Sequence, residues 1–155
     1  MESRDPRLVP LFIGYSFMVS YARTALVEFG ERAVTDLIRT INDPEDPLSR
    51  RGGAIGSLGG IVRRSRLGMA PPLSDDLRAA VSVVAHELLG HRFIPGYTGS
   101  ITQLALATGD VELRKDLVEL AVDPAAWARR GVTDERLVTP GRRIISRLLD
   151  RTPAP

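Results

Sequence analysis

One segment of the chain, Ala25–Leu48, has a layout that partly recurs 80 residues later. It contains two short apolar helical patterns that meet at Gly30, and the second pattern ends at Asp43-Pro44. Downstream, two similar patterns meet at Gly109 and end at Asp123-Pro124. Superposing the two Asp-Pro pairs aligns apolar positions with each other: Leu26 with Leu106, Leu37 with Leu117 and Ile38 with Val118. An offset of twice about 40 residues matches the period of stacked helix pairs, so the pattern predicts a repetitive helical architecture.

The composition favours helices packed on helices. Hydrophobic residues make up 43% and charged residues 26% of the 155 residues, whereas aromatic residues make up only 5%. The core must therefore be built from Leu, Val, Ile and Ala, which suit helix packing better than a β-sandwich. No period-two pattern of convincing length occurs, so we expect an all-α fold. We expect a single helical-repeat domain over residues 1–151 and a disordered tail over residues 152–155.

Apolar spacing, together with the positions of Gly and Pro, divides the chain into about four helix pairs. The expected helices are Leu8–Phe29, Glu31–Ile41, Leu48–Leu67, Asp75–Gly90, Ser100–Thr108, Val111–Val122, Pro124–Arg130 and Arg136–Asp150, the last interrupted near Pro140-Gly141. The first helix is expected to carry an apolar stripe of Tyr15, Met18, Val19, Ala22, Leu26 and Phe29. Gly52, Gly56 and Gly60 fall on one helix face, which favours close approach of another helix over a phosphate loop.

Several positions of this layout match the degenerate pattern of a known family of helical repeats. They are Leu26, Phe29, Gly30, Ala33, Val34, Leu37, Ile38, Asp43 and Pro44, followed by Arg51, Ala54, Ile55, Leu58 and Gly59. On these residues the chain resembles HEAT-repeat proteins, which are armadillo-like α-solenoids, over most of residues 25–123. The resemblance implies a short solenoid that presents a recognition surface. The long connection over residues 68–73 and the terminal helices depart from the pattern, and an irregular helical bundle is the alternative.

The N-terminal apolar stretch, Leu8–Ala22, is shorter than the roughly 20 residues that cross a bilayer. Pro10, Gly14, Tyr15, Ser16 and Ser20 interrupt it, and the residues before it are mixed in charge. We interpret it as a buried helix rather than a membrane span or a signal peptide. The chain contains no Cys, which is compatible with a reducing compartment. We therefore expect a cytoplasmic protein that does not contact a membrane.

Five arginines and no acidic residue occur between Pro47 and Ala70: Arg50, Arg51, Arg63, Arg64 and Arg66. If this stretch is helical, Arg63 and Arg66 lie on one side, more than about 15 Å from Arg50 and Arg51. Such a strip could contact a phosphate backbone or an acidic partner. The alternative is a solvated face paired with Glu45, Asp75 and Asp76. The formal net charge is only +2, far below that of a dedicated nucleic-acid binder.

The segment His86-Glu87-Leu88-Leu89-Gly90-His91 is the sharpest short motif. It resembles the HEXXGH zinc motif of the dipeptidyl peptidase III family, which would make His86 and His91 ligands and Glu87 the general base. Glu112 could then be a third ligand. On an ideal helix, however, a five-residue spacing turns the two rings about 140° apart. The alternative is a surface helix whose histidines lie favourably near its C-terminus. We expect no catalytic residue, no metal site and no cofactor.

The only tryptophan, Trp127, is either an interface anchor or a residue at the edge of the core. With the five arginines, it completes the set of candidate partner-binding residues. The sequence thus favours a non-enzymatic helical-repeat interaction module that binds another macromolecule. A protein partner or a subunit of a larger assembly is expected, and self-association into a homo-oligomer is possible because four repeats are few. Nucleic-acid binding through the arginines and zinc-dependent hydrolysis at the histidine motif are the alternatives.

Overall fold

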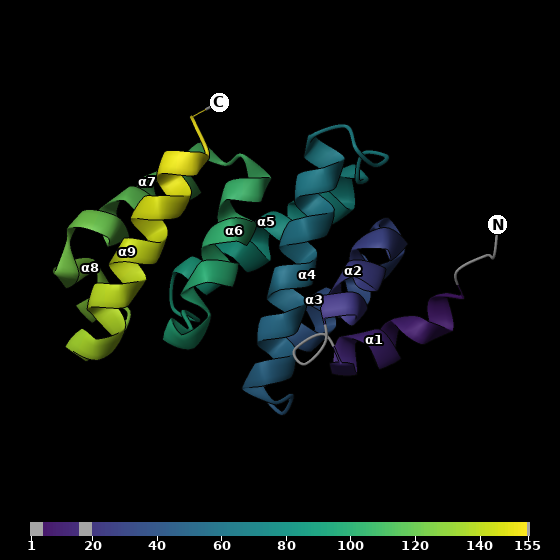
Figure 1. Cartoon of the computed structure of the whole chain (residues 1–155), viewed down its shortest axis with the longest axis horizontal. Helices are drawn as coiled ribbons and strands as arrows, with labels where there is room; N and C mark the ends of the chain where they lie inside the picture. The colour runs from purple at the N-terminus through teal and green to yellow at the C-terminus, as the bar shows by residue number, and fades with distance from the viewer. Residues whose placement is uncertain (1–4, 16–19, 155) are drawn as a thin grey trace. The chain divides into compact units, whose positions relative to one another are not determined.

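Figure 1 shows the computed structural model, which describes residues 5–15 and 20–154. Every regular element over these residues is a helix, which confirms the expected all-α fold. The α-helices are α1 (Val9–Tyr15), α2 (Ser20–Phe29), α3 (Glu31–Asn42), α4 (Leu48–Arg66), α5 (Asp75–Leu89), α6 (Thr98–Thr108), α7 (Val111–Val122), α8 (Pro124–Ala128) and α9 (Glu135–Arg151). The 3₁₀ turns are η1 (Pro6–Leu8) and η2 (Pro95–Tyr97). Within the described residues, no helix has both the length and the apolar character needed to span a bilayer.

The chain divides into two compact units, Met1–Val81 and Ser82–Pro155, which we call the N-terminal and C-terminal units. The division falls inside α5. Each unit contains a short helix hairpin and a long third helix. The single domain expected over residues 1–151 stays a prediction.

In the N-terminal unit, α4 packs against both helices of the α2–α3 hairpin (Figure 1). Leu26, Leu37, Ile41, Ile55 and Leu58 are fully buried. α2 approaches α4 closely at Gly60, where an added Cβ would lie 2.7 Å from Cγ2 of Val27. The close helix approach expected at the glycine face is therefore confirmed at Gly60.

Backbone signals set the ends of α3, as the sequence predicts. Gly30 precedes the helix with a φ of 60°, a conformation that favours glycine. Asp43 follows it in an extended conformation, and its N–H donates to the carbonyl oxygen of Arg39. The residue before a proline avoids helical dihedral angles, which explains why α3 stops there.

The expected single helix over residues 8–29 is wrong, because α1 and α2 are separate helices packed against each other. The ring centroids of Phe12 and Phe29 lie 5.9 Å apart. In one straight helix, residues 17 positions apart would be about 25 Å apart along the axis. Two short helices can bury these rings on each other, which one long helix cannot. Tyr15 of the expected stripe is exposed, and Met18 and Val19 lie outside the described residues.

In the C-terminal unit, α9 packs against both helices of the α6–α7 hairpin. Gly109 ends α6 with a φ of 73°, and Asp110 caps α7 by accepting the N–H groups of Glu112 and Leu113. The hairpin ends and the bounds of α7 therefore match the sequence prediction. Thr152, the first residue of the predicted tail, has a carbonyl oxygen that accepts a hydrogen bond from Nη1 of Arg114 at 2.7 Å.

The interruption expected at Pro140-Gly141 is wrong, because α9 runs through Pro140 without a break. Pro140 is exposed, whereas Val138, Gly141 and Ile145 on the opposite side are buried. A proline inside a helix removes one backbone hydrogen bond and costs about 3 kcal/mol or more. Burial of the apolar face of α9 offsets this cost and keeps the helix continuous.

Each unit contains an equivalent contact between its hairpin and its long helix. In the N-terminal unit, Nε of Arg51 on α4 donates to the carbonyl oxygen of Ile41 at 3.0 Å. In the C-terminal unit, Nε of Arg142 on α9 donates to the carbonyl oxygen of Ala121 at 3.0 Å. Ile41 and Ala121 are each the next-to-last residue of their helices and are 80 positions apart, the same offset as the two Asp-Pro pairs. Cations are favourable at this end of a helix, where carbonyl groups lack helical partners.

Candidate functional site

The five candidate arginines of α4 do not form one strip, because the helix places them in two groups. Arg50 and Arg51 lie near its start, about 20 Å along the axis from Arg63. Nη1 of Arg50 pairs with Oδ1 of Asp46 at 2.9 Å. Arg51 is half-buried and holds the end of α3 through Ile41. This first group is therefore engaged within the N-terminal unit.

The second group, Arg63, Arg64 and Arg66, occupies the last turn of α4. A positive charge here interacts favourably with the helix dipole, by about 0.3–1 kcal/mol for an exposed residue. This gives a local reason for the cluster that does not need a partner. Arg63 and Arg66 are exposed and Arg64 is half-buried.

A Schellman motif closes α4 and fixes the residues that follow these arginines. Met69 N–H donates to the carbonyl oxygen of Arg64 at 2.9 Å, and Gly68 N–H donates to that of Ser65 at 3.2 Å. Gly68 has the positive φ, 70°, that this motif requires. Leu67 and Met69 are left 60% and 63% exposed. The end of α4 therefore presents two large apolar side chains next to its arginines.

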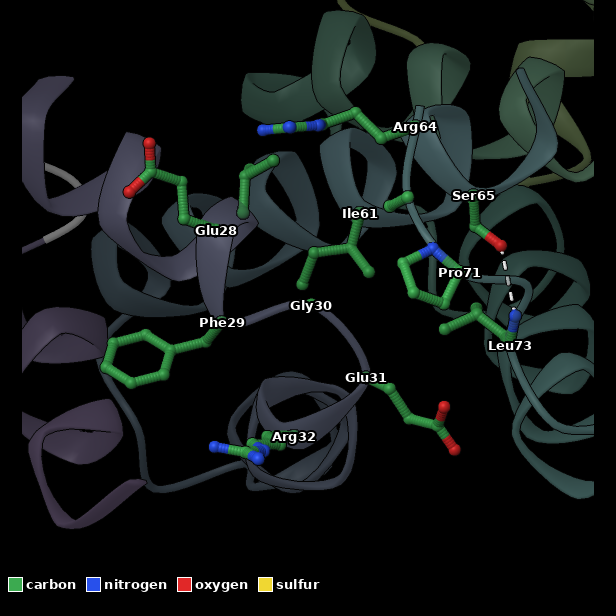
Figure 2. Close-up of a pocket in the computed structure, with 12 residues that line it drawn as sticks. Glu28, Phe29, Gly30, Glu31, Arg32, Ile61, Arg64, Ser65, Pro71 and Leu73 are labelled. Carbon is green, nitrogen blue, oxygen red and sulfur yellow. Dashed lines mark hydrogen bonds between the residues drawn. The ribbon is translucent and has the colours of Figure 1, made fainter. Parts of the chain in front are cut away.

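A pocket of about 600 Å³ lies beside Arg64. The end of α2, Gly30 and the start of α3 line one part of it, over residues 27–32, and Ile61, Ser65 and Leu73 line another. Figure 2 shows Glu28 and Arg64 along one edge, with Glu31 and Arg32 along another and Ile61 between them. The pocket thus has an apolar interior and an edge that carries both carboxylates and guanidinium groups.

Ser65 ties the connector after α4 to the pocket wall. The hydroxyl oxygen of Ser65 accepts a hydrogen bond from the N–H of Leu73 at 3.0 Å, as Figure 2 shows. Leu73 is buried, so the connector is anchored by both a polar and an apolar contact. The wall formed by Ala70, Pro71 and Leu73 is therefore held in place.

Arg64 lacks a hydrogen bond that its burial calls for. Its Nε atom is buried and has no hydrogen-bond partner in the part of the chain that the structure describes. Leaving a buried donor unsatisfied costs about 1–3 kcal/mol. A partner with an acceptor in the pocket would recover part of this free energy if the Arg64 side chain turned its Nε toward that acceptor.

Sequence reasoning found Arg64 but missed Glu28, Glu31 and Arg32 at the same pocket. Glu28 lies at the end of α2, and Glu31 and Arg32 lie at the start of α3, where charged side chains look like ordinary surface residues. They lie more than 30 positions before Arg64 in the chain. The packing of α2 against α4 brings them close to it. The helix-breaking Gly30 was the only local signal of a bend at this place.

The side chains of the histidine motif do not come together around a common point where a metal ion could bind. Nε2 of His86 donates to Oδ2 of Asp110 at 2.9 Å, since a carboxylate only accepts. Glu87 pairs with Arg92 at 2.9 Å, and Glu112 pairs with Lys115 at 2.6 Å. α5 ends at Leu89, so His91 lies beyond the helix and is exposed. Over residues 5–15 and 20–154, no three His, Cys, Asp or Glu side chains form a group that could hold a metal ion.

The contact with His86 changes the acidity of Asp110. The hydrogen bond from His86 lowers the pKa of the Asp110 carboxyl group below its ordinary value, and the backbone N–H groups of Leu113 and Glu112 add to the effect. Asp110 therefore serves two contacts at once. It caps α7 through Oδ1 and holds the end of α5 through Oδ2.

Trp127 is a core residue, which corrects its assignment to a partner-binding surface. Its side chain has 0% exposure, and its Nε1 donates to the carbonyl oxygen of Leu120 at 2.8 Å. The ring also stacks edge-on against Phe93, with centroids 5.3 Å apart. With its one donor satisfied and its whole ring covered, Trp127 has no surface left for a partner.

Comparison with known proteins adds no relative: no protein-family model matches the chain, and no curated protein or solved structure does so either.

Proposed function

We propose that the chain is a non-enzymatic helical-repeat interaction module that binds a protein partner through the end of α4. The contact surface comprises Arg63, Arg64, Arg66, Leu67 and Met69, with the adjacent pocket receiving a side chain of the partner. Arg50 and Arg51 hold the N-terminal unit together and lie outside this surface. The arrangement proposed for the helices is a short HEAT-like solenoid, supported by the matching hairpins and the matching Arg51 and Arg142 contacts.

The observation that carries this proposal is the half-buried Arg64, whose Nε lacks an acceptor beside an open pocket. Buried polar groups in folded proteins are nearly always hydrogen-bonded, so an unsatisfied one is unusual. If the Arg64 side chain turned its Nε toward the pocket, a carboxylate or carbonyl oxygen from a partner would provide the acceptor. The pocket has room for the side chain that carries it.

The exposed apolar residues favour a protein partner over a nucleic acid. Leu67 and Met69 flank the arginines and are both more than half exposed. Arg and Met are enriched at protein interfaces. A phosphate backbone would contact the arginines but leave the two apolar side chains in water.

The test is quantitative affinity purification of the tagged full chain from its native host. The variant Arg63→Ala/Leu67→Ser/Met69→Ser removes three exposed contacts. The control Arg39→Ala/Val83→Ser/Val111→Ser makes similar chemical changes at other exposed positions. Far-UV circular dichroism and the thermal midpoint verify that both variants fold.

A protein that co-purifies with the wild type and the control but is lost from the first variant is the expected result. Equal recovery with both variants would contradict the proposed surface. Recovery of nucleic acid alone, released by nuclease, would favour the phosphate-binding alternative instead.

A further inference from the structure

A second candidate surface lies in the C-terminal unit, where a groove of about 530 Å³ follows α9 at the end of α7. Ala121 contributes from α7, and Thr139, Arg142, Arg143, Ser146 and Arg147 contribute from α9. The α9 residues recur at steps of three and four, so they form one continuous strip along that helix. Nothing in the proposed α4 surface depends on this groove.

Arg142 gives the groove a fixed positive charge. Its Nε donates to the carbonyl oxygen of Ala121 at 3.0 Å, and its Nη2 donates to that of Val122 at 3.1 Å. These two contacts hold the guanidinium group against the end of α7. Both acceptors are uncharged carbonyl oxygens, and Arg142 forms no ion pair with a carboxylate of the described residues.

Arg143 and Arg147 add two further charges that the described residues leave unpaired. Both residues are exposed, and neither forms an ion pair or a side-chain hydrogen bond with residues 5–15 or 20–154. They lie one helical turn apart, which is about 6 Å along the axis. Asp150, at one end, is the only acidic residue in the lining.

Two exposed apolar residues of α7 lie close in sequence to Ala121, the α7 residue that lines the groove. Val122, next to the lining residue Ala121, is 66% exposed, and Val118 one turn earlier is 47% exposed. Exposed valines a turn apart lie on the same helix face. The surface therefore combines a row of guanidinium groups on α9 with a short apolar ridge on α7.

We propose that this groove binds an acidic segment of a protein partner in which carboxylates alternate with apolar side chains. In an extended segment, every second residue is about 6.6 Å apart and points the same way. Two carboxylates at that spacing match the step of about 6 Å from Arg143 to Arg147. The intervening apolar side chains point to the other side, toward Val118 and Val122.

The same features count against a nucleic acid as the occupant. The lining contains no aromatic ring on which a base could stack. Asp150 would repel an unbroken phosphate chain at one end of the groove, whereas a peptide can place an uncharged residue there. The side chains of Val118 and Val122 also offer no charge or hydrogen-bond donor to a phosphate group.

The test measures fluorescence anisotropy of labelled probes with the full chain. The probes are a peptide of about ten residues in which Glu and Leu alternate, a polyglutamate of equal length and an oligothymidylate of equal length. Arg143→Ala/Arg147→Ala should weaken binding of the Glu-Leu peptide by about tenfold, the loss expected for two partly exposed charge pairs. The control Arg39→Ala/Arg78→Ala removes two other exposed arginines and the same net charge, and should bind as the wild type does.

Two further variants test the apolar ridge and the independence of the two surfaces. Val118→Ser/Val122→Ser should weaken the Glu-Leu peptide but leave the weaker polyglutamate binding unchanged. The variant altered at Arg63, Leu67 and Met69 should bind the peptide normally, so failure of the α4 surface would not count against the groove. Tighter binding of oligothymidylate than of the peptide, or equal peptide affinity in the α9 variant and its control, would overturn the proposal.

Discussion

At Gly141, α9 comes into close contact with the ring of Trp127. A Cβ atom added at Gly141 would lie 2.9 Å from Cζ2 and Cζ3 of that ring, and closer still to Cη2. Trp127 is fully buried and is held by its hydrogen bond to Leu120, so it cannot move aside freely. We expect Gly141→Ala to destabilise the protein by about 1–3 kcal/mol, the usual cost of overpacking.

Urea unfolding followed by far-UV circular dichroism measures this loss. Gly99→Ala is the matched control, because Gly99 is also helical and an added Cβ would meet Ile144 at an ordinary 3.7 Å. That control should be neutral or slightly stabilising, since alanine is the better helix former. A Gly141→Ala variant as stable as the wild type would show that the Trp127 ring can shift.

The pair of His86 and Asp110 makes a prediction about pH. The hydrogen bond from His86 lowers the folded-state pKa of Asp110, so its contribution to stability is fully present above the unfolded value of about 3.9. This contribution is lost as the pH falls through the lowered folded pKa. In His86→Ala, we expect the pKa of Asp110 to rise toward its ordinary value and the loss of stability on acidification to shrink.

Carbon NMR of the carboxyl groups during an acid titration measures this shift. Asp134 is an internal control, because a hydrogen bond from Arg136 lowers its pKa independently of His86. The pKa of Asp134 should be the same in the wild type and in His86→Ala. An unchanged pKa of Asp110 in the variant would show that the backbone N–H groups of α7 cause the effect.

At the scale of the elements, Arg51 and its neighbour Arg50 test how arginines hold the helices together. Arg51 is half-buried and donates to Ile41 at the end of α3, whereas Arg50 forms an ion pair with Asp46 and is 46% exposed. We expect Arg51→Ala to cost about 1–3 kcal/mol, because it removes a part-buried hydrogen bond whose donor is charged. Arg50→Ala should cost less than about 1 kcal/mol, as exposed ion pairs do.

Chemical denaturation of the two single variants gives both values under the same conditions. The comparison is well matched, because the residues are adjacent and each change removes one positive charge. Equal losses of stability would mean that the contact with Ile41 contributes no more than a surface pair. In that case, Arg51 would return to the set of candidate partner-binding arginines.

The elements that sequence predicts best are those whose ends are set by backbone chemistry. Gly30 and Asp43 fix α3, and Gly109 and Asp123 fix α7, because glycine with positive φ and a residue before proline act locally. The errors arise where distant packing decides. Burial of Phe12 on Phe29 sets α1 apart from α2.

The same contrast between local signals and distant packing applies to the candidate site. The arginines at the end of α4 were visible in the sequence, because they lie close together on one helix. The pocket beside them was not visible, because its lining comes from the junction of α2 and α3, more than 30 residues earlier, and from the connector after α4. Trp127 was ambiguous for a related reason: its burial, its contact with Phe93 and the close approach of Gly141 all depend on residues distant in the sequence.

At the scale of the whole molecule, the two units share a plan of a helix hairpin with a long helix packed on both of its members. The long helix carries the arginine that holds the end of the hairpin in each case. In the C-terminal unit, the insertion of α8 separates the two partners by 21 positions rather than 10. This shared plan is why the 80-residue offset is visible in the sequence even though the connections differ in length.

The division between the units falls inside α5, which makes that helix the place to test whether the chain unfolds as one domain. Val83 lies near its middle and is 58% exposed, so replacing it changes the helix rather than the core. Val83→Pro removes a helical hydrogen bond at a cost of about 3 kcal/mol or more, whereas Val83→Ala should be nearly neutral.

Trp127, the only tryptophan, reports on the C-terminal unit alone, and far-UV circular dichroism reports on the whole chain. In the wild type and in Val83→Ala, we expect both signals to change at the same urea concentration. The reason is that α5 belongs partly to each unit, so unfolding of α5 with one unit also removes it from the other. In Val83→Pro the two transitions should separate, and separate transitions already in the wild type would replace the single domain with two.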